Sequence, residues 1–272
     1  AGDPLGELTA LDFVDWTTRI PSRTFEPLVY PFDSLMLKTL APNPDEDAGS
    51  VTSFVETIPR DLFIALKART KELGSRLNAP LMVAFFAAIA DVARHQQPDL
   101  PAPLNIRSVC AVDLRTYVEP PLPIDYMNNS AAVVPASASF PNVVPGEGGI
   151  TGDLWPIAKA ANQGVVDAIA NGEGFRLNDI TKRGAFAEMG PYFAIPCLWS
   201  NVGHIATPHA EAAETMISGA ATNPVVTGHC TEAGNVLALT ITYAPNLHEE
   251  SAMRLVAQRF RHHVTSLATT SS

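Results

Sequence analysis

An ordered run of hydrophobic patterns between residues 50 and 140 constrains most strongly what this chain can fold into. Residues 51–58 alternate apolar and polar side chains, as a half-buried strand does. Pro59 then opens a predicted helix over residues 60–73, because proline is tolerated in a first helical turn. Residues 81–94 are apolar almost all round, which predicts a second helix buried between layers, with Asn78 as its cap. The next predicted element is a strand over residues 104–114.

Helices and strands continue through the second half of the chain. Residues 131–138 and 195–205 predict strands, and residues 154–171 and 177–189 predict helices. A final amphipathic helix is predicted over residues 249–267. Mixed strands with helices segregated around them predict an α/β fold, a two-layer sandwich with a mixed sheet.

A β-hairpin precedes the final helix. Its predicted strands are residues 225–231 and 236–243, joined by a turn at residues 232–235. In the second strand Thr240 and Thr242 share the face opposite the apolar one. We expect that face to point to solvent or into a groove.

The composition excludes several classes of function. A formal net charge of −10 argues against nucleic-acid binding and against simple electrostatic docking on anionic membranes. The longest apolar stretch, residues 81–90, is about half of what a bilayer span needs, so we expect no membrane span. The sequence contains no Gly-x-Ser-x-Gly elbow, Walker loop or His-Glu-x-x-His motif.

The three cysteines lie far apart in the sequence and have no metal-ligand spacing. Cys110, Cys197 and Cys230 are therefore expected to be buried free thiols, and no bound metal is expected. Free thiols suit a reducing compartment, which favours a cytoplasmic location.

Five short motifs follow one another in an order that is typical of one family. They are Ile58-Pro59-Arg60-Asp61-Leu62, Leu77-Asn78-Ala79-Pro80-Leu81, Val112-Asp113-Leu114-Arg115, Asn128, and Trp199-Ser200-Asn201-Val202-Gly203. In this order they resemble the carboxy-terminal lobe of the chloramphenicol-acetyltransferase-like superfamily. Its members include condensation domains of peptide synthetases, fungal alcohol and trichothecene acetyltransferases, and polyketide-associated acyltransferases of the phthiocerol dimycocerosyl transferase type. The resemblance implies an interlobe arm or linker at residues 1–50, the lobe at 51–268 and a tail at 269–272.

By this resemblance the chain is half of a thioester-dependent O- or N-acyltransferase. The lobe would form one wall of a tunnel that an acyl-CoA or a carrier-protein thioester enters from one side and a small alcohol or amine acceptor from the other. Ser200 and Asn201 would lie near the reacting carbonyl, where a hydrogen-bond donor stabilises an oxyanion. His229 would border the tunnel, and Asn128 is a further candidate there.

The candidate residues also have simpler explanations. The resemblance implies that Asp113 and Arg115 form a structural ion pair near the site, but such a pair is more often an ordinary one. His229 could be a hydrogen-bonded structural histidine. Asn201, two residues before Gly203, could mark only a bulge or bend in the strand.

One departure from the family limits what the chain could do alone. The family's general base is the histidine of a His-x-x-x-Asp motif in the amino-terminal lobe, which takes the proton of the acceptor. Here His95 and Asp99 are the one pair with that spacing, and they lie where the buried helix is predicted to end. Solvation and the helix macrodipole explain polar residues there. His262 and His263 lie on the last helix and are expected on an exposed face.

The general base is therefore expected from an amino-terminal lobe. That lobe could be a separate chain, a missing segment or a second copy of the molecule. The alternative is a catalytically silent remnant that binds a hydrophobic ligand or a protein partner. Both interpretations predict a partner or self-association, because an unpaired lobe would leave a large apolar patch exposed.

Overall fold

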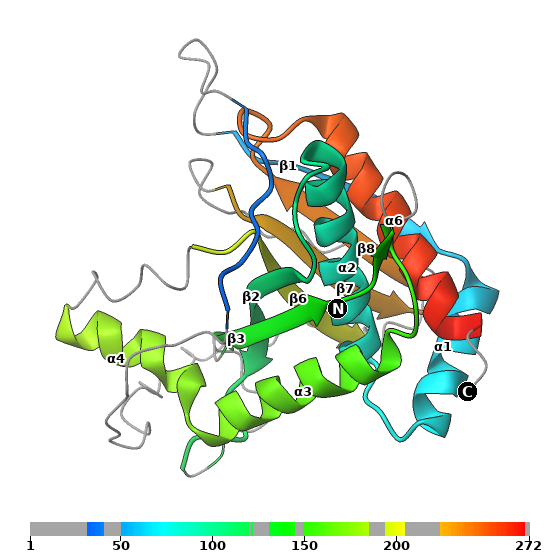
Figure 1. The fold of residues 1–272 in the computed structure, drawn as a ribbon. Coiled ribbons are helices and arrows are strands. Elements are labelled where there is room, and N and C mark those ends of the chain that lie inside the picture. The colour runs from blue at the N-terminus through cyan, green and yellow to red at the C-terminus, as the bar shows by residue number, and fades with distance from the viewer. Residues whose placement is uncertain are drawn as a thin grey trace, which may run out of the picture.

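The chain folds around one six-stranded mixed sheet (Figure 1). A computed structural model describes residues 32–40, 50–119, 121, 131–144, 149–184, 194–204, 224–234 and 236–269. In chain order the elements are β1 (Thr52–Ile58), α1 (Arg60–Glu72), α2 (Asn78–Gln96), β2 (Leu104–Asp113), β3 (Ala131–Phe140), β4 (Val143–Val144), β5 (Gly149–Ile150), α3 (Trp155–Ala170), the 3-10 helix η3 (Glu173–Phe175), α4 (Arg176–Arg183), β6 (Cys197–His204), β7 (Val226–Ala233), β8 (Val236–Tyr243) and α6 (Glu250–Thr269).

The strands of this sheet lie in the order β1-β8-β7-β6-β2-β3. The neighbours β2, β6 and β7 run parallel, whereas the pairs at the two ends of the sheet are antiparallel. The helices α1, α2 and α6 lie together on one face, and α3 packs beside β3 and α2 (Figure 1). This arrangement confirms the predicted α/β fold, a two-layer sandwich with a mixed sheet.

One face of the sheet, here called the helix face, packs against α2 and α6. A row of opposed residues crosses five strands on this face: Cys110, Trp199, Gly228, Ile241 and Phe54. The centroid of the Trp199 ring lies 5.4 Å from that of Phe85 in α2 and 6.4 Å from that of Phe260 in α6. A Cβ atom at Gly228 would lie 2.7 Å from the Phe85 ring, so this position requires glycine. The main hydrophobic core therefore lies between the sheet and these helices.

The opposite face, here called the hydroxyl face, carries many hydroxyl-bearing side chains along β1, β8, β7 and β6. Two adjacent rows of opposed residues define it: Val55, Thr240, His229 and Ser200 in one, and Ser53, Thr242, Thr227 and Leu198 in the other. Thr240 and Thr242 share this face, as predicted. Both are buried, at 1% and 6% exposure, so the expected contact with solvent is wrong. The strand β8 lies inside the sheet, between β1 and β7, and every one of its residues after Val236 is buried.

The helix α2 is buried along almost its whole length. Every residue from position 79 to 93 is buried, which confirms the prediction from its apolar sequence. The predicted cap is wrong, because Leu77 occupies the cap position and no side chain caps the helix. Asn78 instead accepts a 2.8 Å hydrogen bond from Nε1 of Trp199 on the helix face. A buried indole N–H needs an acceptor, and Asn78 provides it.

His263 is buried in the helical layer, so its predicted exposure is wrong, whereas its neighbour His262 is exposed. Nε2 of His263 donates a 2.8 Å hydrogen bond to Oδ2 of Asp91 in α2. The other carboxylate oxygen accepts a 2.7 Å hydrogen bond from the backbone nitrogen of Ile150 in β5. At Gly149 a Cβ atom would lie 2.6 Å from that oxygen, so the close approach requires glycine. This polar contact ties α2, α6 and β5 together.

Some predicted features lie outside the described residues, namely Asn128, most of the interlobe arm and positions 185–189 of a predicted helix. The described part of the arm, residues 32–40, lies beside the sheet. Its Leu35 donates a backbone hydrogen bond to Asn105, and its Leu40 donates one to Leu247. Among the helices of the described ranges, none has both the length and the apolar character needed to cross a membrane.

Candidate functional site

Two predicted site residues, Ser200 and His229, lie side by side on the hydroxyl face. They are opposed in the parallel pair β6 and β7, and Thr240 of β8 stands next in the same row. Neighbouring strands lie about 4.8 Å apart, so the row brings three polar side chains from three strands together.

Thr240 was not predicted as a site residue, although the sequence contained a signal for it. The hairpin pairs Ala233 with Val236, and this tight turn fixes the register of the whole pair. Counting back from the turn places Thr240 opposite His229. The order of β6 and β7, by contrast, depends on a parallel pairing that no local pattern reveals.

The imidazole of His229 is fully buried on the hydroxyl face. None of its surface is exposed, and neither Nδ1 nor Nε2 has a hydrogen-bond partner among the described residues. Burial lowers the pKa of His229 to about 4, so the ring is neutral at pH 7. A buried polar group without a hydrogen bond costs about 1–3 kcal/mol. The simple explanation of His229 as a hydrogen-bonded structural histidine therefore finds no support in this part of the chain.

Two other buried histidines provide a contrast. Nε2 of His248 lies 2.7 Å from the carbonyl oxygen of Pro224, and Nε2 of His263 donates to Asp91. Each of these two rings therefore has one bonded nitrogen, although Nδ1 of His248 is also without a partner among the described residues. The hydroxyl of Thr242, in the next row of the hydroxyl face, resembles His229 in being buried without a partner in the described residues.

Ser200 and Asn201 point to opposite faces of the sheet. Ser200 is 8% exposed on the hydroxyl face, whereas Asn201 is opposed to Cys230 on the helix face. Oδ1 of Asn201 accepts a 2.9 Å hydrogen bond from the backbone nitrogen of Gly203, which has a φ of +82°. The strand register shifts between these two residues, so the bulge that the sequence suggested is present. An oxyanion role for Ser200 or Asn201 stays a prediction.

Asp113 and Arg115 pair with each other at the carboxyl end of β2. Nη2 of Arg115 lies 2.6 Å from Oδ2 of Asp113, and its Nε lies 2.8 Å from the same oxygen. The hydrogen bonds from Arg115 lower the pKa of the Asp113 carboxyl. The Asp113 side chain is 51% exposed, and an exposed ion pair contributes at most about 1 kcal/mol. A role for this pair at a lobe junction stays a prediction.

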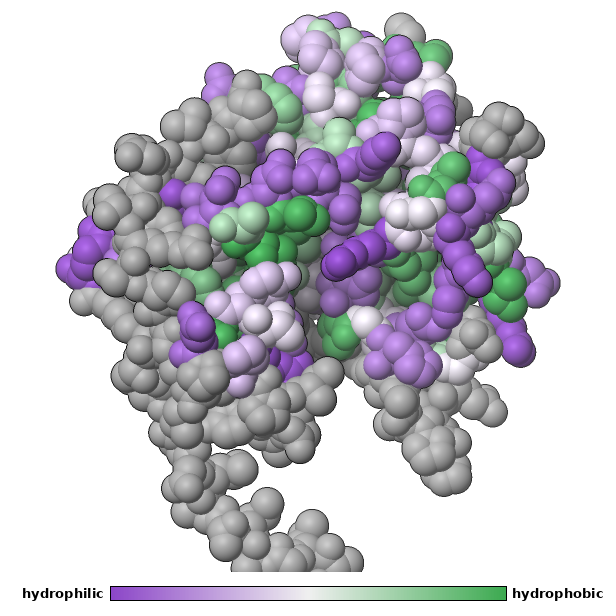
Figure 2. All heavy atoms as spheres, turned by 90° about the horizontal axis from the view of Figure 1, so that it is seen from below, coloured by the Kyte–Doolittle hydropathy of each residue, from purple (hydrophilic) through white to green (hydrophobic). Residues whose placement is uncertain are grey.

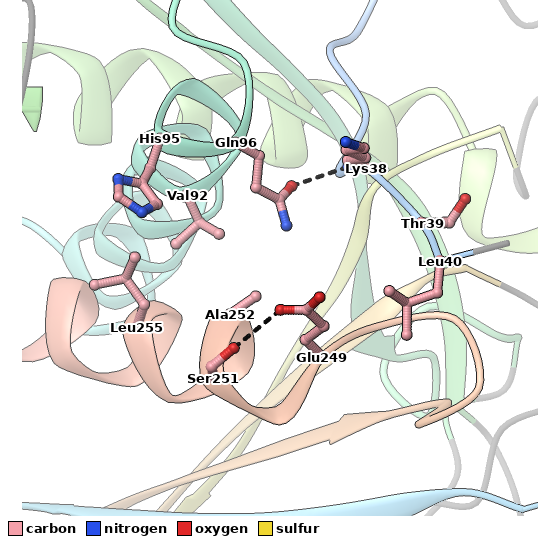
Figure 3. Close-up of a pocket in the computed structure, with 10 residues that line it drawn as sticks. All are labelled: Lys38, Thr39, Leu40, Val92, His95, Gln96, Glu249, Ser251, Ala252 and Leu255. Carbon is pink, nitrogen blue, oxygen red and sulfur yellow. Dashed lines mark hydrogen bonds between the residues drawn. The ribbon is translucent and has the colours of Figure 1, made fainter.

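His95 lies on the wall of a polar cavity of about 430 Å³ between α2, α6 and residues 38–40 (Figure 3). Its imidazole and the carboxylate of Glu249 lie on opposite sides of this cavity (Figure 3). The His95 side chain is exposed in the last turn of α2. In the described ranges, imidazole–carboxylate contacts are made by His204 and His263, and no such contact joins His95 to Asp99. His95 therefore fits the simple explanation of a helix-end residue.

A second cavity, of about 700 Å³, lies at the edge strand β3. Its wall includes Ser137 and Ser139 of β3 and Pro156 and Ile157 of α3, and none of its lining residues is charged. Figure 2 shows the side of the molecule on which α3 lies, where polar and hydrophobic side chains alternate in patches around a hollow. A cavity with this lining suits an apolar group.

The residues that the structure describes include no group of three or more His, Cys, Asp or Glu side chains placed to hold a metal. The three cysteines are free and buried, which confirms that prediction. Burial raises the pKa of Cys110 to about 11 and that of Cys197 to about 12, and it also raises the pKa of Cys230.

Solved structures share this fold, although neither a protein-family model nor a curated protein matches the sequence. The trichothecene 15-O-acetyltransferase of Fusarium sporotrichioides matches 86% of this chain and 49% of its own, with a TM-score of 0.62 and 13% identity. The epimerization domain from the third module of tyrocidine synthetase B matches 88% of this chain and 52% of its own, with a TM-score of 0.59 and 13% identity.

The condensation domain of the Monacolin K polyketide synthase matches 94% of this chain and 56% of its own, with a TM-score of 0.58 and 12% identity. The chain thus spans about half the length of the structures that it matches. Identities this low establish the fold alone. The chain has the α/β fold of about half of each of these proteins, in agreement with the fold that the order of its motifs predicted.

Proposed function

We propose that this chain is the carboxy-terminal half of a thioester-dependent O- or N-acyltransferase. In this proposal the hydroxyl face forms one wall of a tunnel for the acyl group and its acceptor. An acyl-CoA or a carrier-protein thioester would donate the acyl group, and a small alcohol or amine would accept it. The observation that carries the proposal is the likeness to an O-acetyltransferase and a condensation domain over about half of each.

Acyl transfer requires a base and an oxyanion site. The base takes the proton of the acceptor as its oxygen or nitrogen attacks the thioester carbonyl, the carbon–sulfur bond breaks, and the leaving thiolate takes up a proton. Hydrogen-bond donors hold the negative charge that develops on the carbonyl oxygen. Ser200 and His229 are the candidates for such donors, because they stand together on the hydroxyl face.

In this proposal the base comes from a complementary amino-terminal lobe, which is a separate chain, another segment of a longer polypeptide or a second copy of the molecule. Two described histidines have a carboxylate within 4 Å, namely His204 with Glu232 at 3.8 Å and His263 with Asp91 at 2.8 Å. Asp91 and His263 are buried between α2, α6 and β5, where their contact joins these elements. Glu232 is also bound by Lys67. His95 is accessible but has no carboxylate behind it in the described ranges.

Complementation tests this proposal. The purified chain would be mixed with acetyl-CoA or a longer acyl-CoA and a panel of primary alcohols and amines, alone and together with an amino-terminal lobe that carries His-His-x-x-x-Asp-Gly. Chromatography would measure free CoA and the acylated acceptor. We expect both products in the mixture with the lobe. If no combination of lobe, donor and acceptor consumes a thioester, the acyltransferase proposal fails.

A variant pair makes the test specific. Loss of one oxyanion donor lowers kcat by about 100- to 1000-fold, so we expect Ser200→Ala to reduce turnover of the complemented enzyme strongly. Ser251→Ala is the matched control, because Ser251 is an exposed serine of α6 whose hydroxyl contacts Glu249, away from the hydroxyl face. Equal turnover by the two variants would remove Ser200 from the oxyanion site.

The second candidate function is a catalytically silent module that binds a hydrophobic ligand. The uncharged cavity of about 700 Å³ between β3 and α3 favours it, because that volume accommodates a small apolar molecule. Saturable binding of a fluorescent fatty acyl probe, together with no turnover in any complemented mixture, would support this function over the first.

A further inference from the structure

We propose that the cavity between α2, α6 and residues 38–40 binds a free α-amino acid with an apolar side chain, held as its zwitterion. Its volume of about 430 Å³ lies within the usual range of small-molecule sites, about 300–1,000 Å³. Several of its lining residues are exposed, so a ligand can enter. The cavity lies among the helices, whereas Ser200 and His229 lie on the hydroxyl face, so the inference goes beyond the proposed acyl transfer.

The first argument is a carboxylate without a counterion. The side chain of Glu249 points into the cavity, where the hydroxyl of Ser251 donates a 3.2 Å hydrogen bond to its Oε2 (Figure 3). Among the described residues no cationic side chain pairs with Glu249, whereas its neighbour Glu250 pairs with Arg254. An ammonium group of a ligand would give Glu249 a charge-assisted hydrogen bond.

The second argument is a pair of donor groups from other elements of the cavity wall. The backbone nitrogen of Lys38 donates a 3.0 Å hydrogen bond to Oε1 of Gln96. This contact fixes the orientation of the amide, so its NH₂ group is the end that points into the cavity (Figure 3). Lys38 also lines the cavity, and its ammonium group has no ion pair within the described ranges. Both groups can only donate, so they suit a carboxylate of a ligand.

The third argument is an apolar part of the wall. Val92 of α2 lies with Ala252 and Leu255 of α6 on one side of the cavity, and Leu40 lies across from them (Figure 3). A ligand with an apolar side chain would remove this surface from water, which stabilises the complex. A polar side chain would lose its own hydration there without gaining a hydrogen bond.

The balance of charge in the lining favours a zwitterion. Glu249 and Lys38 are its one acidic and one basic residue, so its formal charge is zero with His95 neutral. A ligand with a single charge would be attracted by one of these groups and repelled by the other. An α-amino acid carries an ammonium group, a carboxylate and a side chain on one carbon, so it matches all three parts of the wall.

Leucine and two analogues test this selection, because each analogue lacks one charge. 3-Methylbutylamine is leucine without its carboxylate, and 4-methylpentanoate is leucine without its ammonium group. Saturation-transfer NMR with the full chain at pH 7 would measure the binding of each probe. Long-range ¹H–¹⁵N spectra of the protein labelled with ¹⁵N-histidine would locate the bound probe, since His95 lines the cavity. The spectrum of His95→Gln assigns the ring resonances of His95.

We expect L-leucine to bind saturably and to shift the ring resonances of His95. The resonances of His248 and His263 should stay in place, because these residues do not line the cavity. Each analogue should bind at least about ten-fold more weakly than leucine, because one hydrogen bond to a charged group is lost. Glycine should also bind more weakly, since it has no side chain to bury against the apolar residues.

Two variants assign the charges, each with a matched control. Glu249→Gln should weaken the binding of leucine at least about ten-fold without weakening that of 4-methylpentanoate. Its control is Glu250→Gln, because Glu250 pairs with Arg254 and does not line the cavity. Lys38→Met should weaken the binding of leucine without weakening that of 3-methylbutylamine. Its control is Lys71→Met, because Lys71 is an exposed residue of α1.

The site is refuted if L-leucine leaves the His95 resonances of the wild-type protein unchanged, or if either analogue binds as tightly as leucine. Equal affinity of folded Glu249→Gln and Glu250→Gln for leucine would refute it as well. None of these measurements depends on acyl transfer. Binding of leucine without turnover in any complemented mixture would keep the site and refute the acyltransferase. Turnover without binding of leucine would keep the acyltransferase and refute the site.

Discussion

Replacing His263 by leucine should destabilise the fold much more than the same replacement of its neighbour His262. The two residues are adjacent in α6, so the change in helix propensity is the same. They differ in their surroundings, because His263 is 2% exposed and donates to Asp91, whereas His262 is exposed. In His263→Leu the Asp91 carboxylate stays buried and keeps only the hydrogen bond from Ile150 among the described residues.

The magnitude follows from the burial of Asp91. Removing one partner of a buried pair costs about 3–5 kcal/mol, because the other charge is left uncompensated. The 2.7 Å hydrogen bond from Ile150 remains, so we expect the lower end, about 3 kcal/mol. In a domain of this size 1 kcal/mol shifts Tm by about 2–4 °C, which gives a loss of about 6–12 °C. His262→Leu should change the free energy of unfolding by less than about 0.5 kcal/mol.

Urea unfolding followed by tryptophan fluorescence measures this difference, since Trp199 lies in the core next to α6. Both variants should keep the slope of the wild-type transition, and only His263→Leu should lower its midpoint. Adding Asp91→Leu to His263→Leu should recover part of the loss, because the unpaired carboxylate is then removed. Equal midpoints for the two single variants would refute the claim that the contact between Asp91 and His263 stabilises the fold.

Three further predictions follow from other buried groups. Stability should fall as the pH is lowered from 6.5 to about 4, because unfolded His229 binds a proton that the buried ring, with its pKa of about 4, does not bind. Urea titrations should show that the free energy of unfolding falls by at most about 3 kcal/mol over this pH range. In His229→Leu the free energy of unfolding should depend less on pH. In thermal melts Gly228→Ala should lower the free energy of unfolding by about 1–3 kcal/mol, because its Cβ would meet the Phe85 ring. Gly164→Ala has open space around its Cβ and should raise the free energy of unfolding by up to about 1 kcal/mol. The three buried thiols should resist a thiol reagent in the native protein and react in urea, so rapid labelling of the native chain would contradict their burial.

Local patterns predicted the type and order of the elements well. The strand predicted at residues 51–58 and the helix at 60–73 agree with β1 and α1 to within one residue at each end. The burial of α2 was also predicted correctly, because its run of apolar residues leaves almost no polar side to face solvent. These features follow from periodicity and from proline and glycine signals, which act over a few neighbouring residues.

Contacts between polar residues far apart in the sequence could not be predicted in this way. Asp91 and His263 are 172 positions apart, and no local pattern in either helix indicates the partner of the other residue. Asn78 resembles a helix cap, but its partner Trp199 lies 121 positions away. Ser200 and His229 were both candidates from the sequence, yet their position side by side depends on the parallel pairing of β6 and β7.

The central claim is that the general base for acyl transfer comes from outside this chain. The most direct test is the rate at which the purified chain alone transfers acetyl groups from acetyl-CoA to 1-butanol, followed by chromatography of free CoA and butyl acetate. The account predicts a rate equal to that of buffer. A catalysed rate that His95→Ala or His229→Phe abolishes would contradict it, because the base would then belong to this chain.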